Sequence, residues 1–277
     1  HRNAANREEL NRGRDQARYA EYLHGQVREL LTQYGQVDIL WFDFSYPRPD
    51  GTGKGRADWQ SEKLLELVRS LQPRVILDDR LDLAAGWDIK TPEQFQPRQW
   101  VTHEGQPVVW EACQTFSGSW GYHRDEASWK TVDQLVRMLV DTVSKGGNLL
   151  LNVGPTGRGE FDARALDRLQ GIGEWMRRHQ RSIYGCTQAP AGFHAPDDCR
   201  LTYNPDTNRM YLHVFAWPFV ELHLEGFANR IEYAQLLNDA SEIRIQERPD
   251  WQAKFGDVSP GVTTLRLPVH QPEVPVP

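Results

Sequence analysis

Polar side chains that can carry chemistry stand where four strand-like segments of this sequence end. The first is Asp43, which follows a mostly apolar run at residues 37–42 and precedes a loop with two prolines. The other three segments end in the turn Asp78-Asp79-Arg80, in Glu111 and in Asn152. A closed α/β barrel gathers the carboxyl ends of its strands onto one face, and two carboxylates there predict glycoside hydrolysis. One carboxylate attacks the anomeric carbon, and a second, kept protonated by its surroundings, protonates the leaving oxygen.

Each of these side chains also has a purely structural interpretation, which the sequence leaves open. Asp43 can cap its loop or pair with a neighbouring arginine, and Arg80 can pair with Asp78 or Asp79. Glu111 can be a core carboxylate held by an arginine. Sequence alone does not identify which pair of carboxylates meets the separation of about 5–5.5 Å that a retaining glycosidase needs.

Metal and phosphate chemistry find no support in the motifs of the sequence. The histidines are scattered without a His-x-x-x-His pair, and the three cysteines have no metal-binding spacing. The glycine-rich stretch 51–55 lacks the spacing of a phosphate-binding loop, and no helix opens directly after it. The sequence therefore offers no motif for binding a metal ion or a phosphate group.

The elements that must position these residues alternate between helix and strand. Apolar residues at three- and four-residue steps predict helices over 14–34, 59–71, 129–144 and 162–178. Short apolar runs predict strands over 37–43, 74–77, 107–110 and 148–153, and Glu111 would close the third. This alternation is typical of parallel α/β units. A long irregular loop over 81–106 lies between them, and loops of that length are usually functional or disordered.

The pattern changes after about residue 184. Residues 209–215 alternate with period two, and further short strands are expected at 220–224, 230–237, 243–246 and 262–267. Turn residues separate them, which predicts an antiparallel β-sandwich. We therefore expect two domains, an α/β catalytic domain at 1–185 and a β-sandwich at 186–277.

Composition excludes some classes of function. The chain has 277 residues with a net charge of −6, and no basic block stands out, which argues against nucleic acid as the main partner. No apolar run of about 18 residues or more predicts a membrane span. Three cysteines allow one disulfide, for instance Cys186 with Cys199, or free thiols. Secreted, periplasmic and cytoplasmic locations all stay open.

Several blocks of the sequence together resemble the α-L-fucosidases of glycoside hydrolase family 29. They follow the order of that family between about residues 17 and 185, and the β-rich tail is similar to the C-terminal sandwich of the family. The blocks are Gly25–Gly35 with Trp41-Phe42-Asp43, Trp110–Thr115 with Ser119–Tyr122, Val143–Pro155, and Ile172–Trp175 with Ile183–Gly185.

The resemblance implies a retaining mechanism through a covalent glycosyl-enzyme intermediate, on terminal α-L-fucosyl linkages of oligosaccharides or glycoconjugates. It also implies that neither a cofactor nor a metal ion takes part. Asp43 matches the nucleophile of the family, and Trp41 and Arg80 match positions that line the fucose pocket. For the acid/base, Glu93 is the first choice, Glu111 the alternative and Asp88 the third. Glu111 is also a candidate for binding the substrate. Two aromatic side chains are expected to wall the site, Trp120 and Tyr122.

The sequence also departs from the family pattern. The histidines that begin the catalytic domain of the family are not found here, and only four or five strands are expected, whereas a (β/α)8 barrel takes about 250 residues. We therefore expect a barrel that is incomplete at its N-terminal side. Its open strands would expose apolar surface and unpaired edges, which predicts a homo-oligomer or association with the missing N-terminal part.

Two other functions stay open at this point. One is a carbohydrate-binding fragment without catalysis, because the family's N-terminal histidines are absent. The other is a related exo-glycosidase that acts on a different sugar, since the loops that set specificity are not decided by sequence.

Overall fold

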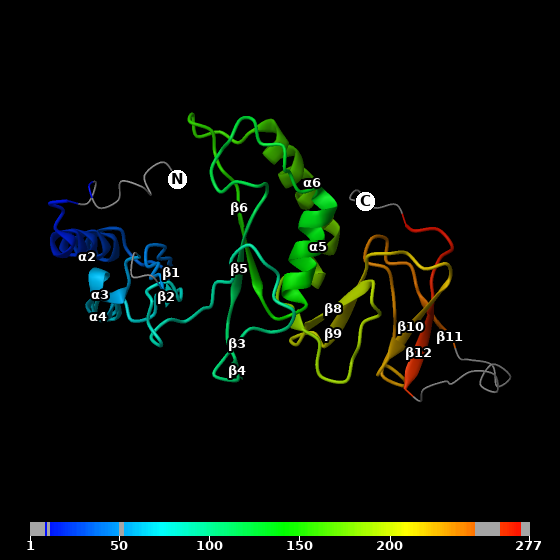
Figure 1. The fold of residues 1–277 in the computed structure, drawn as a ribbon. Helices are drawn as coiled ribbons and strands as arrows, with labels where there is room; N and C mark the ends of the chain where they lie inside the picture. The colour runs from blue at the N-terminus through cyan, green and yellow to red at the C-terminus, as the bar shows by residue number, and fades with distance from the viewer. Residues whose placement is uncertain (1–8, 10–11, 50–52, 247–260, 273–277) are drawn as a thin grey trace. The chain divides into compact units, whose positions relative to one another are not determined.

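The computed structural model describes residues 9, 12–49, 53–246 and 261–272. The chain packs as two compact units, residues 1–91 and 92–277, each with its own helices and strands (Figure 1). None of the helices described is long and apolar enough to cross a membrane. The division into compact units does not test the expected domain boundary near residue 185, which stays a prediction.

Residues 1–91 form two consecutive helix–strand units. Helix α2 spans Gln16–Gln33 and begins at the N-cap Asp15, whose side chain accepts the main-chain N–H of Arg18. Strand β1 (Ile39–Leu40) follows, and the short helix α3 (Arg56–Trp59) leads into α4 (Ser61–Leu71) and strand β2 (Ile76–Leu77). The two strands pair in parallel, with Ile39 opposite Ile76. The chain therefore places the carboxyl ends of β1 and β2 at the same edge.

The helices of this unit cover its strands through one apolar cluster. Each helix turns its stripe of buried residues inward, as the helical spacing predicts. The buried members of the cluster are Val27, Leu31, Phe42, Leu64, Val68, Val75, Leu77 and Leu81. This packing fixes the strand ends from which the polar side chains project.

Residues 92–277 begin with a second α/β part. A small hairpin of β3 (Thr102–His103) and β4 (Gln106–Pro107) precedes β5 (Glu111–Thr115). Helix α5 (Val132–Val143) leads into β6 (Asn148–Asn152), which pairs in parallel with β5. Helix α6 (Ala163–His179) and the 3-10 turn η1 (Gln180–Ser182) complete this part.

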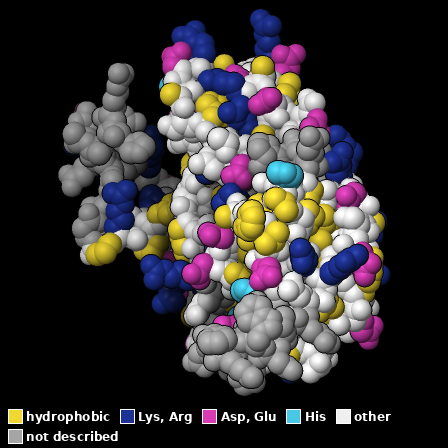
Figure 2. Space-filling view, turned by 90° about the vertical axis from the view of Figure 1, so that its right-hand side faces the viewer, with side chains coloured by type: hydrophobic (Ala, Val, Ile, Leu, Met, Phe, Trp, Pro, Cys, Tyr) yellow, Lys and Arg dark blue, Asp and Glu magenta, His cyan; other side chains and the backbone are white. Residues whose placement is uncertain are grey.

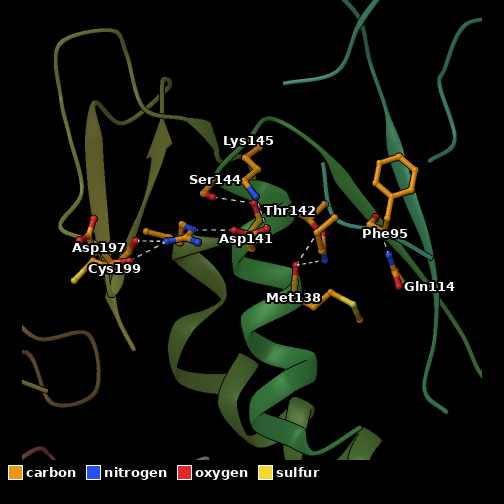
Figure 3. Close-up of polar contacts among 11 residues, drawn as sticks. Phe95, Gln114, Met138, Asp141, Thr142, Ser144, Lys145, Asp197 and Cys199 are labelled. Carbon is orange, nitrogen blue, oxygen red and sulfur yellow. Dashed lines mark hydrogen bonds and ion pairs between the residues drawn. The ribbon is translucent and has the colours of Figure 1, made fainter. Parts of the chain in front are cut away.

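Helix α5 links the strands of this part to the β-rich region that follows. Asp141 lies between Lys145 and Arg200, with nitrogen–oxygen distances of 2.5 and 2.7 Å (Figure 3). On the other side of the helix, Thr142 donates to Met138 at 2.8 Å and to Gln96 at 3.2 Å. The same helix therefore anchors both neighbouring regions through polar contacts.

The β-rich region contains two antiparallel sheets. One has the order β7–β8–β9, from Thr187–Gln188, Cys199–Asn204 and Arg209–Val214. The other has the order β10–β12–β11, from Glu221–Glu225, Val262–Arg266 and Arg244–Gln246. A shared apolar cluster with Leu201, Leu222, Leu224 and Leu265 joins the sheets.

Some large hydrophobic side chains of the β-rich region stay at the surface. The exposed ones are Phe219, Tyr233, Ile245 and Val269. Figure 2 shows hydrophobic side chains gathered at the centre of one face of the molecule, with charged side chains around them.

The structure corrects two of the expected strands. The strand expected at 230–237 is wrong, because these residues form only one bridge, between Gln235 and Glu242. The strand expected at 107–110 is also misplaced, and β5 begins at Glu111. Within the described residues the parallel strands form pairs, without a closed barrel. All three cysteines are free, which is one of the two alternatives that the sequence left open, and the pairing of Cys186 with Cys199 is not formed.

Candidate active site

The site begins where β1 and β2 end side by side. Trp41-Phe42-Asp43 follows β1, and Asp78-Asp79-Arg80 follows β2. The main-chain N–H of Phe42 donates to both carboxyl oxygens of Asp78, at 3.1 Å each. Asp78 is fully buried, and this burial raises the pKa of its carboxyl to about 7. Asp78 therefore holds the end of the neighbouring strand, which accords with the structural interpretation of this residue.

Arg80 connects the two strand ends through its guanidinium group. Its Nη1 donates to Oδ1 of Asp43 at 2.9 Å. The guanidinium also lies 4.5 Å from the centre of the Trp41 ring, a cation–π contact. The Arg80 side chain is 12% exposed, whereas that of Asp43 is 55% exposed. The cation is thus embedded in the protein, and the carboxylate is open to solvent.

Thr91 fixes the orientation of Arg80 from the other side. Nε and Nη2 of Arg80 donate to Oγ1 and to the carbonyl oxygen of Thr91, at 3.0 and 3.3 Å. Thr91 in turn donates from its amide and its hydroxyl to Oδ1 of Asp79, at 3.0 and 2.7 Å. Asp79 also pairs with Lys90 at 3.3 Å. The arginine is therefore held at three of its nitrogens, and its planar fork points Nη1 at Asp43.

Tyr46 was not among the sequence-based candidates, although it contacts Asp43 directly. Its hydroxyl donates to Oδ1 of Asp43, the same oxygen that Arg80 contacts. Partial burial and the neighbouring carboxylate raise the pKa of this phenol. Its signal in the sequence is weak, because it lies in the loop after the strand and no motif marks it. Thr91 was also not among the sequence-based candidates, because no motif marks it either.

The acid/base candidates lie mostly in the second unit. Glu93 is exposed and pairs with Cys113 in a parallel bridge, so its segment runs beside β5 like a short strand. Glu111 is the first residue of β5, not a residue after a strand end, and it therefore lies at the amino end of the β5–β6 pair. Asp88 accepts the amide of Leu77 and the guanidinium of Arg69, both at 2.7 Å, which gives it a structural role.

The two aromatic candidates lie at the carboxyl end of β6. The side-chain amide of Asn152 donates to the carbonyl oxygen of Trp120 at 2.6 Å. A Cβ added to Gly154 would lie 2.5 Å from the main chain of Gly121 and Tyr122, so this loop packs closely on the turn after β6. Trp120 and Tyr122 are 39% and 40% exposed. Both side chains are therefore accessible to a ligand.

The structure brings Trp41, Asp43 and Arg80 together in residues 1–91. Asp88 also lies in residues 1–91, whereas the other candidates belong to residues 92–277, where Glu111 and Trp120 lie at opposite ends of the β5–β6 pair. Among the residues that the structure describes, no three His, Cys, Asp or Glu side chains are grouped so as to hold a metal ion. The arrangement at Asp43 suits attack by an exposed carboxylate that a fixed guanidinium holds in place.

Enzymes of the α/β-barrel class carry their catalytic residues at the carboxyl ends of parallel strands, and glycoside hydrolases use carboxylates for their chemistry. A sequence model of this class, "Alpha-L-fucosidase", matches residues 1–181. The chain therefore belongs to the α-L-fucosidase family.

Solved and curated relatives agree with this assignment. The structure of α-L-fucosidase isoenzyme 1 from Paenibacillus thiaminolyticus matches with a TM-score of 0.82 and 40% identity, over 94% of this chain and 61% of that one. An α-fucosidase from Thermotoga maritima in complex with a mechanism-based inhibitor matches with a TM-score of 0.68 and 28% identity, over 91% and 53%. The α-L-fucosidase of Dictyostelium discoideum is 29% identical over 264 residues, which are 91% of this chain and 53% of the relative. The chain spans about half the length of the curated relatives it matches, or less.

Proposed function

We propose that the chain is part of a retaining exo-glycosidase that hydrolyses terminal α-L-fucosyl linkages in oligosaccharides or glycoconjugates. The observation that carries the proposal is the contact between Asp43 and Arg80 at the carboxyl end of parallel strands, in a member of the α-L-fucosidase family. The exposure of Asp43 supports the role of nucleophile, because an attacking carboxylate must reach the anomeric carbon. Trp41 offers an aromatic wall for the sugar next to it.

In this proposal the reaction has two steps, and both pass through Asp43. Its carboxylate attacks the anomeric carbon, the glycosidic bond breaks, and the leaving oxygen takes a proton from the acid. Water then attacks the same carbon, gives a proton to the base, and releases Asp43 as a carboxylate. No cofactor takes part in either step.

Glu93 is the proposed acid/base, and Glu111 stays the alternative. Glu93 is exposed and lies on a strand-like segment beside β5, which supports this role. In the sequence it follows Thr91, which contacts Arg80, by two residues. Glu111 lies at the amino end of β5, whereas strand ends of the opposite sense carry the chemistry in α/β barrels. Trp120 and Tyr122 are proposed to contact the apolar methyl group of fucose.

We further propose that residues 1–185 belong to a (β/α)8 barrel and 186–277 to a β-sandwich, and that the barrel strands need additional neighbours. Among the described residues, β1 and β6 each have a strand neighbour on one side only. Ile39 and Leu150, on these two strands, are 51% and 39% exposed. Such edges favour association with another chain or segment. A monodisperse monomer in multi-angle light scattering would contradict this association.

Hydrolysis of an aryl α-L-fucoside tests the function directly. Asp43→Gly is expected to abolish turnover while leaving the circular dichroism spectrum and the thermal unfolding unchanged. Near-normal turnover by this variant would exclude Asp43 as the nucleophile. Fucose binding by the unaltered chain without any turnover would instead favour a carbohydrate-binding role.

Azide separates the two acid/base candidates. We expect Glu93→Ala to lose activity on unactivated fucosides and to regain rate with azide on an activated one, where no proton donor is needed. Glu111→Ala serves as the matched variant. Rescue of Glu111→Ala alone would reverse the assignment.

A further inference from the structure

One oxygen of the Asp43 carboxylate carries both of its hydrogen bonds. Arg80 donates to Oδ1 at 2.9 Å, and the hydroxyl of Tyr46 donates to the same atom. Among the described residues, nothing donates to Oδ2. The two oxygens of this carboxylate are therefore chemically distinct before any substrate binds.

Main-chain contacts fix the backbone of Tyr46 at the base of its loop. The main-chain N–H of Tyr46 donates to the carbonyl oxygen of Lys54 at 3.0 Å. A Cβ added to Gly53 would lie 2.0 Å from the carbonyl oxygen of Tyr46, so the two sides of the loop base are in close contact. Just beyond, the amide of Arg56 donates to Oδ2 of Asp82 at 2.9 Å.

We propose that Tyr46 is a positioning residue for the nucleophile, which together with Arg80 holds Oδ1 so that Oδ2 is the oxygen that attacks. This inference rests on the proposed function. As the bond from Oδ2 to the anomeric carbon forms, the glycosidic bond breaks and its electron pair leaves on the departing oxygen, which takes a proton from the acid. Tyr46 keeps its own proton throughout.

The same contact acts in the second step. When water displaces Asp43, the electron pair of the bond between the anomeric carbon and Oδ2 returns to the carboxylate. Donors at Oδ1 stabilise the negative charge that develops there, as preorganised donors do at other developing anions. Removing the Tyr46 hydroxyl therefore slows both steps, the first through lost orientation and the second through lost stabilisation.

Covalent trapping measures the first step alone. A 2-deoxy-2-fluoro α-L-fucosyl fluoride is expected to label Asp43, and peptide mass spectrometry locates the label. Tyr46→Phe is expected to lower the rate constant of labelling at least about tenfold, because small misplacements of a reacting group have effects of this order. The reagent concentration for half-maximal rate should change less than about twofold, since reagent binding does not depend on the hydroxyl.

Tyr34→Phe is the matched control, because Tyr34 lies in the same unit, is exposed, and ends helix α2. It should label at the rate of the unaltered chain, and both variants should share its thermal unfolding midpoint. Equal labelling rates for Tyr46→Phe and the unaltered chain would overturn this inference alone. No labelling of the unaltered chain would overturn the proposed function, and this role with it.

A spectroscopic titration tests the contact without any activity. The ultraviolet difference between the unaltered chain and Tyr46→Phe reports the ionisation of Tyr46. Asp43→Asn should move this ionisation to lower pH, because it removes a carboxylate that raises the pKa of the phenol. An ionisation of Tyr46 that is the same with aspartate or asparagine at position 43 would overturn the contact, and the inference with it.

Discussion

Asp78 accepts the main-chain N–H of Phe42 with both carboxyl oxygens, at 3.1 Å each, and so ties the end of β2 to the residue just before Asp43. The group that makes this contact is buried, and its pKa of about 7 means that it gains a negative charge within an ordinary range of pH. The titration of Asp78 therefore makes the stability of residues 1–91 depend on pH.

Asp78→Asn should reveal that dependence. The folded state keeps the proton up to about pH 7, whereas the unfolded chain releases it near the ordinary value of 3.8. Between these values the folded state binds more protons, so Asp78 lowers the free energy of unfolding as pH rises, by up to about 1.4 kcal/mol per pH unit. Urea unfolding at several pH values should show the variant gaining stability relative to the unaltered chain from pH 4 to 7. A constant difference would contradict the prediction.

Arg80→Lys should impair the nucleophile although it keeps the charge. Lysine offers a single ammonium group, so it cannot contact Asp43 and both acceptors of Thr91 at once. We expect covalent labelling of Asp43 to slow about a hundredfold, in line with the loss of an oriented catalytic contact. Arg56→Lys is the control, because the Arg56 side chain is 61% exposed in the same unit. Similar labelling rates for both variants would show that charge alone suffices.

Gly154→Ala should displace the loop that carries Trp120 and Tyr122. The added methyl group would meet main-chain atoms 2.5 Å away, which cannot move aside as a flexible side chain can. We expect a loss of about 1–3 kcal/mol in the free energy of unfolding, the usual range for overpacking, and a raised KM if both aromatics contact the sugar. Gly157→Ala, where nothing lies within 4 Å, should be neutral. Equal stability of the two variants would contradict the close packing.

His213→Gln should change how residues 92–277 respond to acid. Burial lowers the pKa of His213 to about 3, with His179 adding to the effect, and Thr202 lies 3.1 Å from its Nε2. Below pH 6.5 the imidazole of His213 binds a proton in the unfolded chain but not in the folded state. The free energy of unfolding therefore falls from about pH 6.5 towards pH 3. The difference in free energy of unfolding between the variant and the unaltered chain should be the same at pH 7 and pH 8. Below pH 6 this difference should shift in favour of the variant. An unchanged difference across this range would exclude a buried neutral imidazole.

The sequence predicts the helices well because their apolar spacing is long and regular. Helix α2 was expected over 14–34 and spans Gln16–Gln33, and α6 was expected over 162–178 and spans Ala163–His179. The strands are less predictable, because an apolar run does not reveal where pairing begins. The run before Glu111 is an example, since Val109 is 55% exposed and the ladder starts only at Glu111.

The apolar residues of 230–237 mislead for a related reason. Ala234 and Leu236 pack against the apolar cluster of the two sheets, but without a ladder of hydrogen bonds. Within the site, Asp43 and Arg80 were candidates because they stand at strand ends, and the family resemblance added Trp41 and the pocket role of Arg80. Tyr46 and Thr91 act through contacts that depend on how two loops close, which the local sequence does not encode.

The contacts of the segment after Arg80 limit where the length of this chain can be changed. Thr91 is bound by Asp79 and Arg80, Asp88 is bound to Leu77, and Gly86 has a positive φ of 96° against Leu65. These contacts hold residues 81–90 in one fixed loop conformation. Inserting or deleting a single residue there would displace the Arg80 guanidinium from Asp43. Changes in loop length should therefore be made elsewhere in the chain.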